Sequence, residues 1–257
     1  MDWPKFTYHY DGGFAGFLTC VFTAYHQKED PVCFLTPEDG RLSLWPEREV
    51  DADKDKARRV YRSLQPKLGA EGKRLVVQGF LTCLPDREVC LWQFLRLGYA
   101  RGPGVTRDLT HPQVAALTQA VGHLTREAHQ FKGFVRFSDQ GGVLAGEIAP
   151  KNRALPLLGP HFAARYPGEN LVLYDQTHRE ALFCQGGKWA ILPLEDFSLS
   201  PAAGAELDFR ALWRRFYHTI SIEGRYNPRC RMTHMPKRYW GNMTEMQQET
   251  STGLKGG

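Results

Sequence analysis

Hydrophobic positions repeat every three or four residues through the first half of the chain. After a β-prone stretch at Thr7–Tyr10 and a glycine turn, the apolar positions from Phe14 to Tyr25 follow a helical period. A short strand is predicted at Val32–Leu35. Helical spacing returns over residues 51–68, 73–81, 85–97 and 110–133. The first half is therefore predicted to be mainly helical.

From Phe134 onward the hydrophobic pattern changes to a period of two residues, which is typical of strands. A hairpin is predicted across the turn Asp139–Gly142, followed by a short helix over 155–166. Strands are predicted at 134–137, 143–148, 171–174, 181–184 and 188–192. This order favours an antiparallel β-sheet with one helix on a face, and the whole chain is predicted to be α+β.

A final amphipathic helix is predicted over Asp208–Ile222, with Arg210, Arg214 and Arg215 opposite its apolar side. We therefore expect four regions along the chain. These are a mainly helical region over 1–132 that starts with a strand, a glycine turn and a helix; an antiparallel β region over 133–196; a basic, aromatic-rich helical region over 197–245; and a flexible tail over 246–257.

The composition is that of an ordinary globular protein, with 257 residues and 42% hydrophobic positions. No apolar run is long enough to cross a membrane, and the first residues do not resemble a leader sequence. The six cysteines form no C-x-x-C pair, which argues against a zinc ribbon and favours reduced thiols. We therefore expect a cytoplasmic protein with no membrane contact.

The net charge of +5 is unevenly distributed. The stretch from Lys54 to Arg74 carries +6, and the stretch from Arg210 to Trp240 carries +7, which leaves −8 for the rest of the chain. Two basic stretches on an acidic chain are the pattern expected of a protein that binds a polyanion.

The second basic stretch also contains aromatic residues, and arginines together with rings can neutralise phosphates and stack on exposed bases. The alternative is that the rings belong to the core and the arginines form its solvated rim. The candidate nucleic-acid-binding residues are Arg58, Arg59, Arg62, Arg214, Arg215, Arg225, Asn227, Arg229, Arg231, Lys237, Arg238, Tyr239 and Trp240.

The sequence contains no complete catalytic motif. A P-loop, a dinucleotide fingerprint, an H-E-x-x-H motif and a nucleophile elbow are all missing, so no metal site and no cofactor are predicted. Asp11 and His234 are candidates for acid-base chemistry only if a substrate is brought to them. The glycine turn after Asp11 can present free N–H groups to an anion, but Asp11 is expected to accept some of these donors as a helix N-cap.

Both ends of the sequence resemble a known family. The motifs that carry the resemblance are Tyr10-Asp11-Gly12-Gly13-Phe14-Ala15-Gly16-Phe17-Leu18, Asn227-Pro228-Arg229 and Met235-Pro236-Lys237-Arg238-Tyr239-Trp240. They resemble a poorly characterised bacterial family of suspected DNA metabolism or repair proteins, over roughly Tyr8–Glu245. Its members are encoded beside a radical-SAM protein that resembles DNA-repair enzymes, and the domain is also found fused ahead of uracil-DNA glycosylase-like domains.

The resemblance implies a DNA-repair setting and supplies no catalytic residues. Ala15 stands where the family has an acidic residue, and Met243-Thr244-Glu245 stands where the family has leucine before the final glutamate. Neither departure touches the basic and aromatic positions.

Three hypotheses follow. The first is a DNA-binding accessory protein that presents damaged or flipped bases to a radical-SAM or uracil-DNA glycosylase-like partner. The second is a self-sufficient DNA repair enzyme of glycosylase or lyase type, in which Asp11 and His234 meet. The third is a scaffold whose acidic part docks the radical-SAM partner, while the basic stretches only balance its charge.

Overall fold

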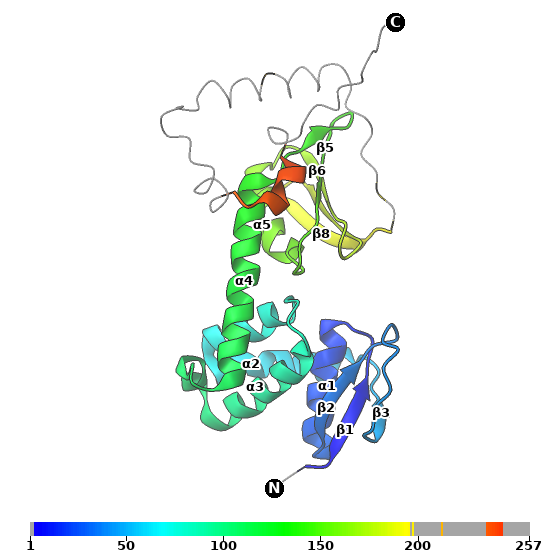
Figure 1. Ribbon diagram of the computed structural model, residues 1–257, viewed down its shortest axis with the longest axis vertical. Coiled ribbons are helices and arrows are strands. Elements are labelled where there is room, and N and C mark those ends of the chain that lie inside the picture. The colour runs from blue at the N-terminus through cyan, green and yellow to red at the C-terminus, as the bar shows by residue number, and fades with distance from the viewer. Residues whose placement is uncertain (1–2, 196, 198–211, 213–234, 244–257) are drawn as a thin grey trace, which may run out of the picture. The chain divides into compact units, whose positions relative to one another are not determined.

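The computed structural model describes residues 3–195, 197, 212 and 235–243, and it has the predicted α+β class (Figure 1). The chain forms two compact units, Met1–Leu124 (unit 1) and Thr125–Gly257 (unit 2). The boundary between them falls within the long helix α4 (Pro112–Phe134). Within the described ranges, no helix is both long and apolar enough to cross a lipid bilayer.

Unit 1 begins with a three-stranded parallel sheet in the order β2-β1-β3. Its strands are β1 (Lys5–His9), β2 (Asp30–Leu35) and β3 (Glu47–Glu49), and α1 (Phe14–Gln27) connects β1 to β2. Gly12 has a φ of +76° in the turn before α1, a conformation that suits glycine. The predicted strand, glycine turn and helix are confirmed, whereas β3 was missed because three charged or exposed residues carry no hydrophobic period.

Three further helical elements complete most of unit 1: α2 (Lys54–Gly79), α3 (Arg87–Arg101) and the 3₁₀ helix η1 (Pro103–Arg107). Asp53 caps α2 by accepting hydrogen bonds from the Asp55 and Lys56 amides at 2.9 and 3.0 Å. Gly69 has a φ of +74° and is not helical, so α2 is kinked at this residue. Its two helical segments, before and after Gly69, correspond to the helices predicted over 51–68 and 73–81.

The core of unit 1 lies where α1, α2 and α3 pack together and against the sheet, and Figure 1 shows α1 beside the strands. Trp92 of α3 is fully buried, and its indole N–H donates to Asp30 of β2 at 2.8 Å. Phe17 of α1 is also fully buried, next to Phe34 of β2. Tyr25 of α1 packs against Trp92 with ring centres 5.3 Å apart, so α1 contacts both the sheet and α3.

Unit 2 contains a five-stranded sheet in the order β4-β5-β6-β7-β8. The elements are β4 (Ser138–Asp139), β5 (Val143–Ile148), α5 (Leu155–Arg165), β6 (Asn170–Asp175), β7 (Glu180–Gln185) and β8 (Lys188–Pro193). The expected fully antiparallel pairing is wrong at one place, because β5 and β6 pair in parallel. α5 lies in the crossover between these two strands, which returns the chain to the end of the sheet where β5 begins, so that β6 can run parallel to β5.

The core of unit 2 joins the end of α4 to α5 and the sheet. The 3₁₀ helix η3 (Lys237–Asn242) adds Tyr239, and Met243 follows it into the same core. The basic helix predicted over Asp208–Ile222 lies outside the described residues, apart from Leu212.

Candidate nucleic-acid interface

The first half of α2 has one buried side and one basic side. Ala57, Val60 and Leu64 are buried at spacings of three and four residues, as the sequence predicts. Tyr61, which follows Val60 directly, is 39% exposed, with the Lys73 ammonium 4.4 Å from its ring centre. The basic residues therefore share the outer side of the helix with one aromatic ring.

The candidate residues Arg58, Arg59 and Arg62 are all exposed on this outer side. Arg58 pairs with Asp55 at 3.1 Å, but both side chains are more than half exposed, so the pair is weak and easily exchanged. Arg62 makes no ion pair with any described residue, and the same holds for Lys54 and Lys67. The basic face of α2, defined as Lys54, Arg58, Arg59, Arg62 and Lys67, is thus largely available to an anionic partner.

An aromatic hollow of about 440 Å³ adjoins this basic face. The Arg59 guanidinium lies 5.0 Å from the centre of the Phe22 ring, and the rings of Phe22 and His26 are nearly parallel, at 14°. The lining residues, which come from α1, α2 and α3, are Val21, Phe22, Tyr25, His26, Arg59, Val60, Ser63 and Tyr99. A candidate arginine is therefore placed at the rim of a ring-lined depression.

Two tyrosines, Tyr25 and Tyr99, line the hollow. Burial raises the pKa of Tyr25 to about 12, and burial also raises the pKa of Tyr99, so both stay protonated at neutral pH. Ser63 donates its hydroxyl to the Val60 carbonyl at 2.7 Å and lies 2.8 Å from the Tyr99 hydroxyl. Since the Ser63 proton is already used, Tyr99 is the donor in the second bond.

The second set of candidates is described only at the C-terminal motif. Lys237 and Arg238 are exposed, whereas Tyr239 is 1% exposed and packs against Phe131 and Phe134 with ring centres 4.9 and 5.4 Å apart. The Tyr239 hydroxyl donates to Gln130 at 2.7 Å, and burial raises its pKa. In this position the Tyr239 ring offers no face on which a base can stack.

The neighbouring Trp240 is partly buried, and its indole N–H donates to the Met235 carbonyl at 2.9 Å. The ammonium of Lys237 lies 5.9 Å from its ring centre. The other predicted residues, Arg214, Arg215, Arg225, Asn227, Arg229, Arg231 and His234, lie outside the described residues.

Asp11 stands at the carboxyl end of β1 and occupies the start of α1. Its carboxylate accepts a hydrogen bond from the Gly13 amide at 2.9 Å, while the N-cap position itself is taken by Gly13. A Cβ at Gly16 would collide with this carboxylate, so a glycine is needed there for Asp11 to lie over the first turn. Because a negative charge already faces the helix N-terminus, the turn is a poor site for a second anion.

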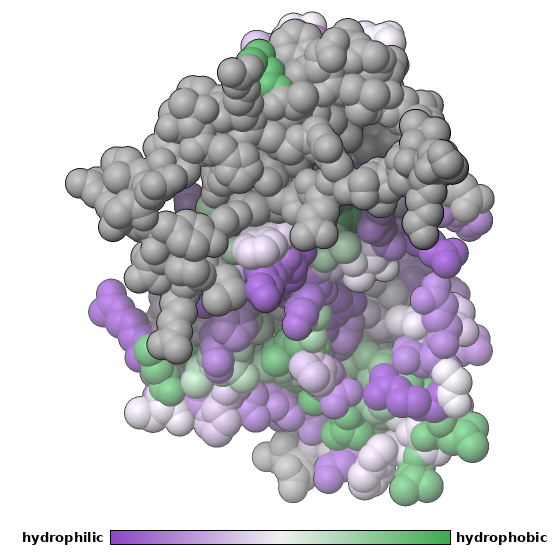
Figure 2. Space-filling model, turned by 45° about the horizontal axis from the view of Figure 1, so that its top comes forward, coloured by the Kyte–Doolittle hydropathy of each residue, from purple (hydrophilic) through white to green (hydrophobic). Residues whose placement is uncertain are grey.

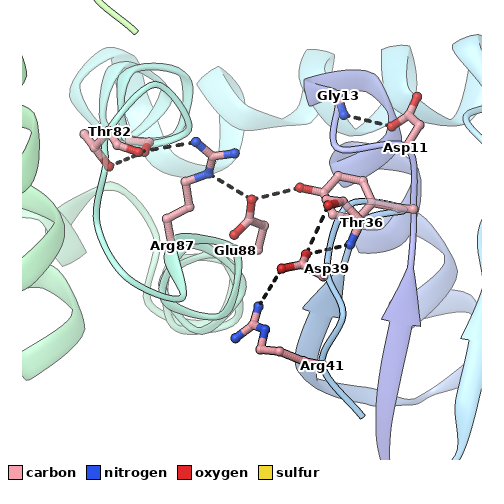
Figure 3. Close-up of polar contacts among 10 residues, drawn as sticks. Asp11, Gly13, Thr36, Asp39, Arg41, Thr82, Arg87 and Glu88 are labelled. Carbon is pink, nitrogen blue, oxygen red and sulfur yellow. Dashed lines mark hydrogen bonds and ion pairs between the residues drawn. The ribbon is translucent and has the colours of Figure 1, made fainter. Parts of the chain in front are cut away.

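A polar pocket of about 300 Å³ lies near the carboxyl ends of β1 and β2. Figure 3 shows Glu88 of α3 pointing toward the segment that carries Thr36 and Asp39, with the Arg87 guanidinium between Glu88 and Thr82. Glu88 accepts hydrogen bonds from the Tyr10 hydroxyl and from Arg87, both at 2.8 Å. Asp39 accepts from the amide and hydroxyl of Thr36 at 2.8 and 3.0 Å. These side chains hold one another, so the pocket presents opposite charges that are already paired.

Known families provide one comparison. A family described as a domain of unknown function, DUF4130, matches residues 85–245, which is more than half of the chain. The chain belongs to the DUF4130 family. No curated protein matches it.

The matched DUF4130 region begins just before α3 and ends just after η3. It includes the C-terminal motif and the tyrosine of the hollow that α3 supplies, Tyr99, whereas α1 and the basic face of α2 precede it. The candidate interface in unit 1 is therefore made of DUF4130 residues together with residues in front of that region.

Sequence reasoning found the arginines of α2 but missed the aromatic hollow beside them. Phe22 and His26 are four residues apart, but the predicted helix ends at Tyr25, and only the observed α1 carries both rings. Ser63 and Tyr99 line the hollow because α2 packs against α3, and no local sequence pattern predicts this packing. The polar pocket around Glu88 was missed for the same reason.

Proposed function

We propose that this chain is a DNA-binding accessory protein in DNA repair or DNA metabolism. The observation that carries the proposal is the exposed basic face of α2 beside a ring-lined hollow. Cations that neutralise phosphates release condensed counterions from DNA, and nearby rings add stacking on exposed bases. Both elements of such a site come together within unit 1.

Figure 2 shows the hydropathy of the residues on one face of the protein. The described residues on this face are mainly hydrophilic, with hydrophobic residues gathered in small separate patches. Interfaces with DNA are more polar and more positively charged than those between proteins.

Fluorescence anisotropy of a labelled oligonucleotide, measured over a range of salt concentrations, tests the proposal. Affinity should fall linearly on a log-log plot, and replacing Arg58, Arg59 and Arg62 together by Gln should reduce the slope by about 2 to 3. A matched control replaces the exposed cations Arg107, Arg126 and Lys188 by Gln, which removes the same charge elsewhere. Absence of binding at low salt, or equal losses in both triple variants, would overturn the proposal.

The partner enzyme is part of the same proposal. On the resemblance of the end motifs, this protein works with a radical-SAM protein or a uracil-DNA glycosylase-like domain. Co-purification with such a partner should survive nuclease treatment, and damaged oligonucleotides should be converted only when the partner is present. Turnover by the pure chain, abolished by Asp11→Asn, would instead support the self-sufficient enzyme.

A further inference from the structure

We infer that the aromatic hollow beside Arg59 receives one unpaired nucleobase of the bound DNA. The inference rests on the proposed function and names what the interface recognises. The hollow measures about 440 Å³, within the range of roughly 300–1,000 Å³ typical of sites that enclose small ligands. This volume is large enough for a single base.

Four aromatic side chains line the hollow, three from α1 and one from α3. Phe22 and His26, one turn apart on α1, lie with their rings nearly parallel and their centres 6.1 Å apart. Tyr25 and Tyr99 supply rings from α1 and α3, with centres 5.6 Å apart. Every base has a π-face on each side, so rings of this kind bind unstacked bases with little sequence preference.

The cations lie at the rim, where the sugar-phosphate backbone of an inserted base would run. Arg59 covers Phe22 and faces solvent, and Arg62 is three residues further along the same helix. A guanidinium plane can either stack on a base or turn toward a phosphate. Arg59 is therefore placed either to stack on the inserted base or to bind its phosphate.

Hydroxyl groups complete the site. The Tyr99 hydroxyl donates to Ser63, which leaves its oxygen free to accept. The Tyr25 hydroxyl has no partner within the described residues and can donate or accept. Because burial keeps both tyrosines neutral, they match the mixed donors and acceptors on the edge of a base.

A base inside a duplex cannot use this site, since its two faces are covered by its stacked neighbours. The hollow therefore favours single-stranded DNA, or a duplex from which one base has been extruded, over a fully paired duplex. The exposed arginines bind phosphates equally in single-stranded DNA, in a duplex with an extruded base and in a fully paired duplex.

The experiment compares three DNA probes of equal length: a single strand, a paired duplex, and a strand made entirely of abasic residues. Phe22→Leu keeps the apolar contact of the side chain and removes the ring. It should weaken binding of the single strand about tenfold and leave binding of the duplex and the abasic strand unchanged. The matched control is Trp45→Leu, which removes an exposed ring that lies under Lys5, outside the hollow and not on α2, and it should change none of the three.

A second variant keeps the test valid if Phe22→Leu fails to fold. Tyr25→Phe removes one hydroxyl and no ring, and it should lower affinity for the single strand a few-fold without affecting the abasic strand. If Phe22→Leu lost affinity equally for the single strand and the abasic strand, or lost none for either, the inference would be overturned. Salt-dependent binding by the native protein would in that case still support the proposed function. Failure of the native protein to bind any probe would overturn the proposed function itself.

Discussion

Two stretches of this chain combine cations with aromatic rings, and the structure uses the rings differently. On α2 and α1, Arg59 and Phe22 lie 5.0 Å apart at the edge of a hollow, with Arg59 exposed. In η3, Arg238 lies a similar 4.7 Å from the Tyr239 ring, but that ring is buried between Phe131 and Phe134. A ring beside an arginine is a candidate for base stacking only where the core does not already contain it.

The difference shows in the hydroxyl groups as well. The Tyr239 hydroxyl is held by Gln130 and Arg238 at 2.7 and 2.6 Å, which ties the C-terminal motif to α4. The Tyr25 hydroxyl in the hollow has no such partner in the described part of the chain. We therefore expect η3 to stabilise unit 2 through its ring and to contact DNA through its charges alone.

The largest effect is expected from Tyr239→Ala. Removing this buried ring should destabilise unit 2 by about 3–5 kcal/mol, because a cavity remains between the two phenylalanines. Hydrogen exchange in α5 and β6 measures the loss. Tyr239→Phe, which removes only the hydroxyl, should cost about 1 kcal/mol and leave DNA affinity unchanged. Normal protection in the alanine variant, together with weaker DNA binding, would contradict the assignment of this ring to the core.

A second prediction concerns the stability of unit 1, which carries the hollow. Glu29 is 5% exposed and accepts hydrogen bonds from Tyr8 at 2.7 Å and from Arg48. Burial alone would raise the pKa of Glu29, but the bonds from Arg48 and Tyr8 outweigh it and hold the pKa below its usual value. Glu29→Gln should therefore destabilise unit 1 by about 1–3 kcal/mol at neutral pH, as measured by hydrogen exchange in β1 and α1.

The pH dependence of this effect has a definite sign. Because the pKa of Glu29 is lower in the folded state, its contribution is present above the unfolded value of about 4.3 and is lost as the pH falls through the folded value. The native protein and Glu29→Gln should thus converge in stability as the pH falls from about 4.3 through the folded pKa of Glu29. A constant difference down to pH 2 would show that the carboxylate is not the cause.

Part of this comparison could be predicted from the sequence. The helical period assigned Val60 and Leu64 to the inner side of α2 and the arginines to its outer side, because a helix fixes which residues share a face. The burial of Tyr239 depends on Phe131, more than a hundred positions earlier, and no local period reports such a contact. The same holds for the parallel pairing of β5 with β6, which depends on the path of α5.

The charges of η3 provide the third prediction. Replacing Lys237 and Arg238 by Gln should weaken binding to the single strand, the duplex and the abasic strand by the same few-fold factor, and should reduce the salt slope by at most about 2. Uniform loss is expected because exposed cations contact phosphates and not bases. A loss confined to the single strand would show that η3 also presents a ring, which would remove the contrast with the hollow.

The smallest effect is expected from the protonation of His161 in α5. It should make the stability of unit 2 depend on pH in a range where the stability of unit 1 does not. Burial, with Lys132 and Arg165 nearby, lowers the pKa of His161 below its usual value near 6.5, and its buried Nε2 has no hydrogen-bond partner among the described residues. A lowered folded pKa means that stability is present above about pH 6.5 and declines as the pH falls from there through the folded value.

Unit 2 should therefore lose a fraction of its stability in mild acid, in a range where Glu29 still supports unit 1. Hydrogen exchange at pH 7 and pH 5 should show faster opening of α5 in the native protein but not in His161→Gln. Since the hollow lies in unit 1, the preference for a single strand over an abasic strand should persist at pH 5, even where contacts made by η3 weaken. Loss of that preference in step with α5 would mean that base recognition depends on unit 2 and not on the ring surface of Phe22.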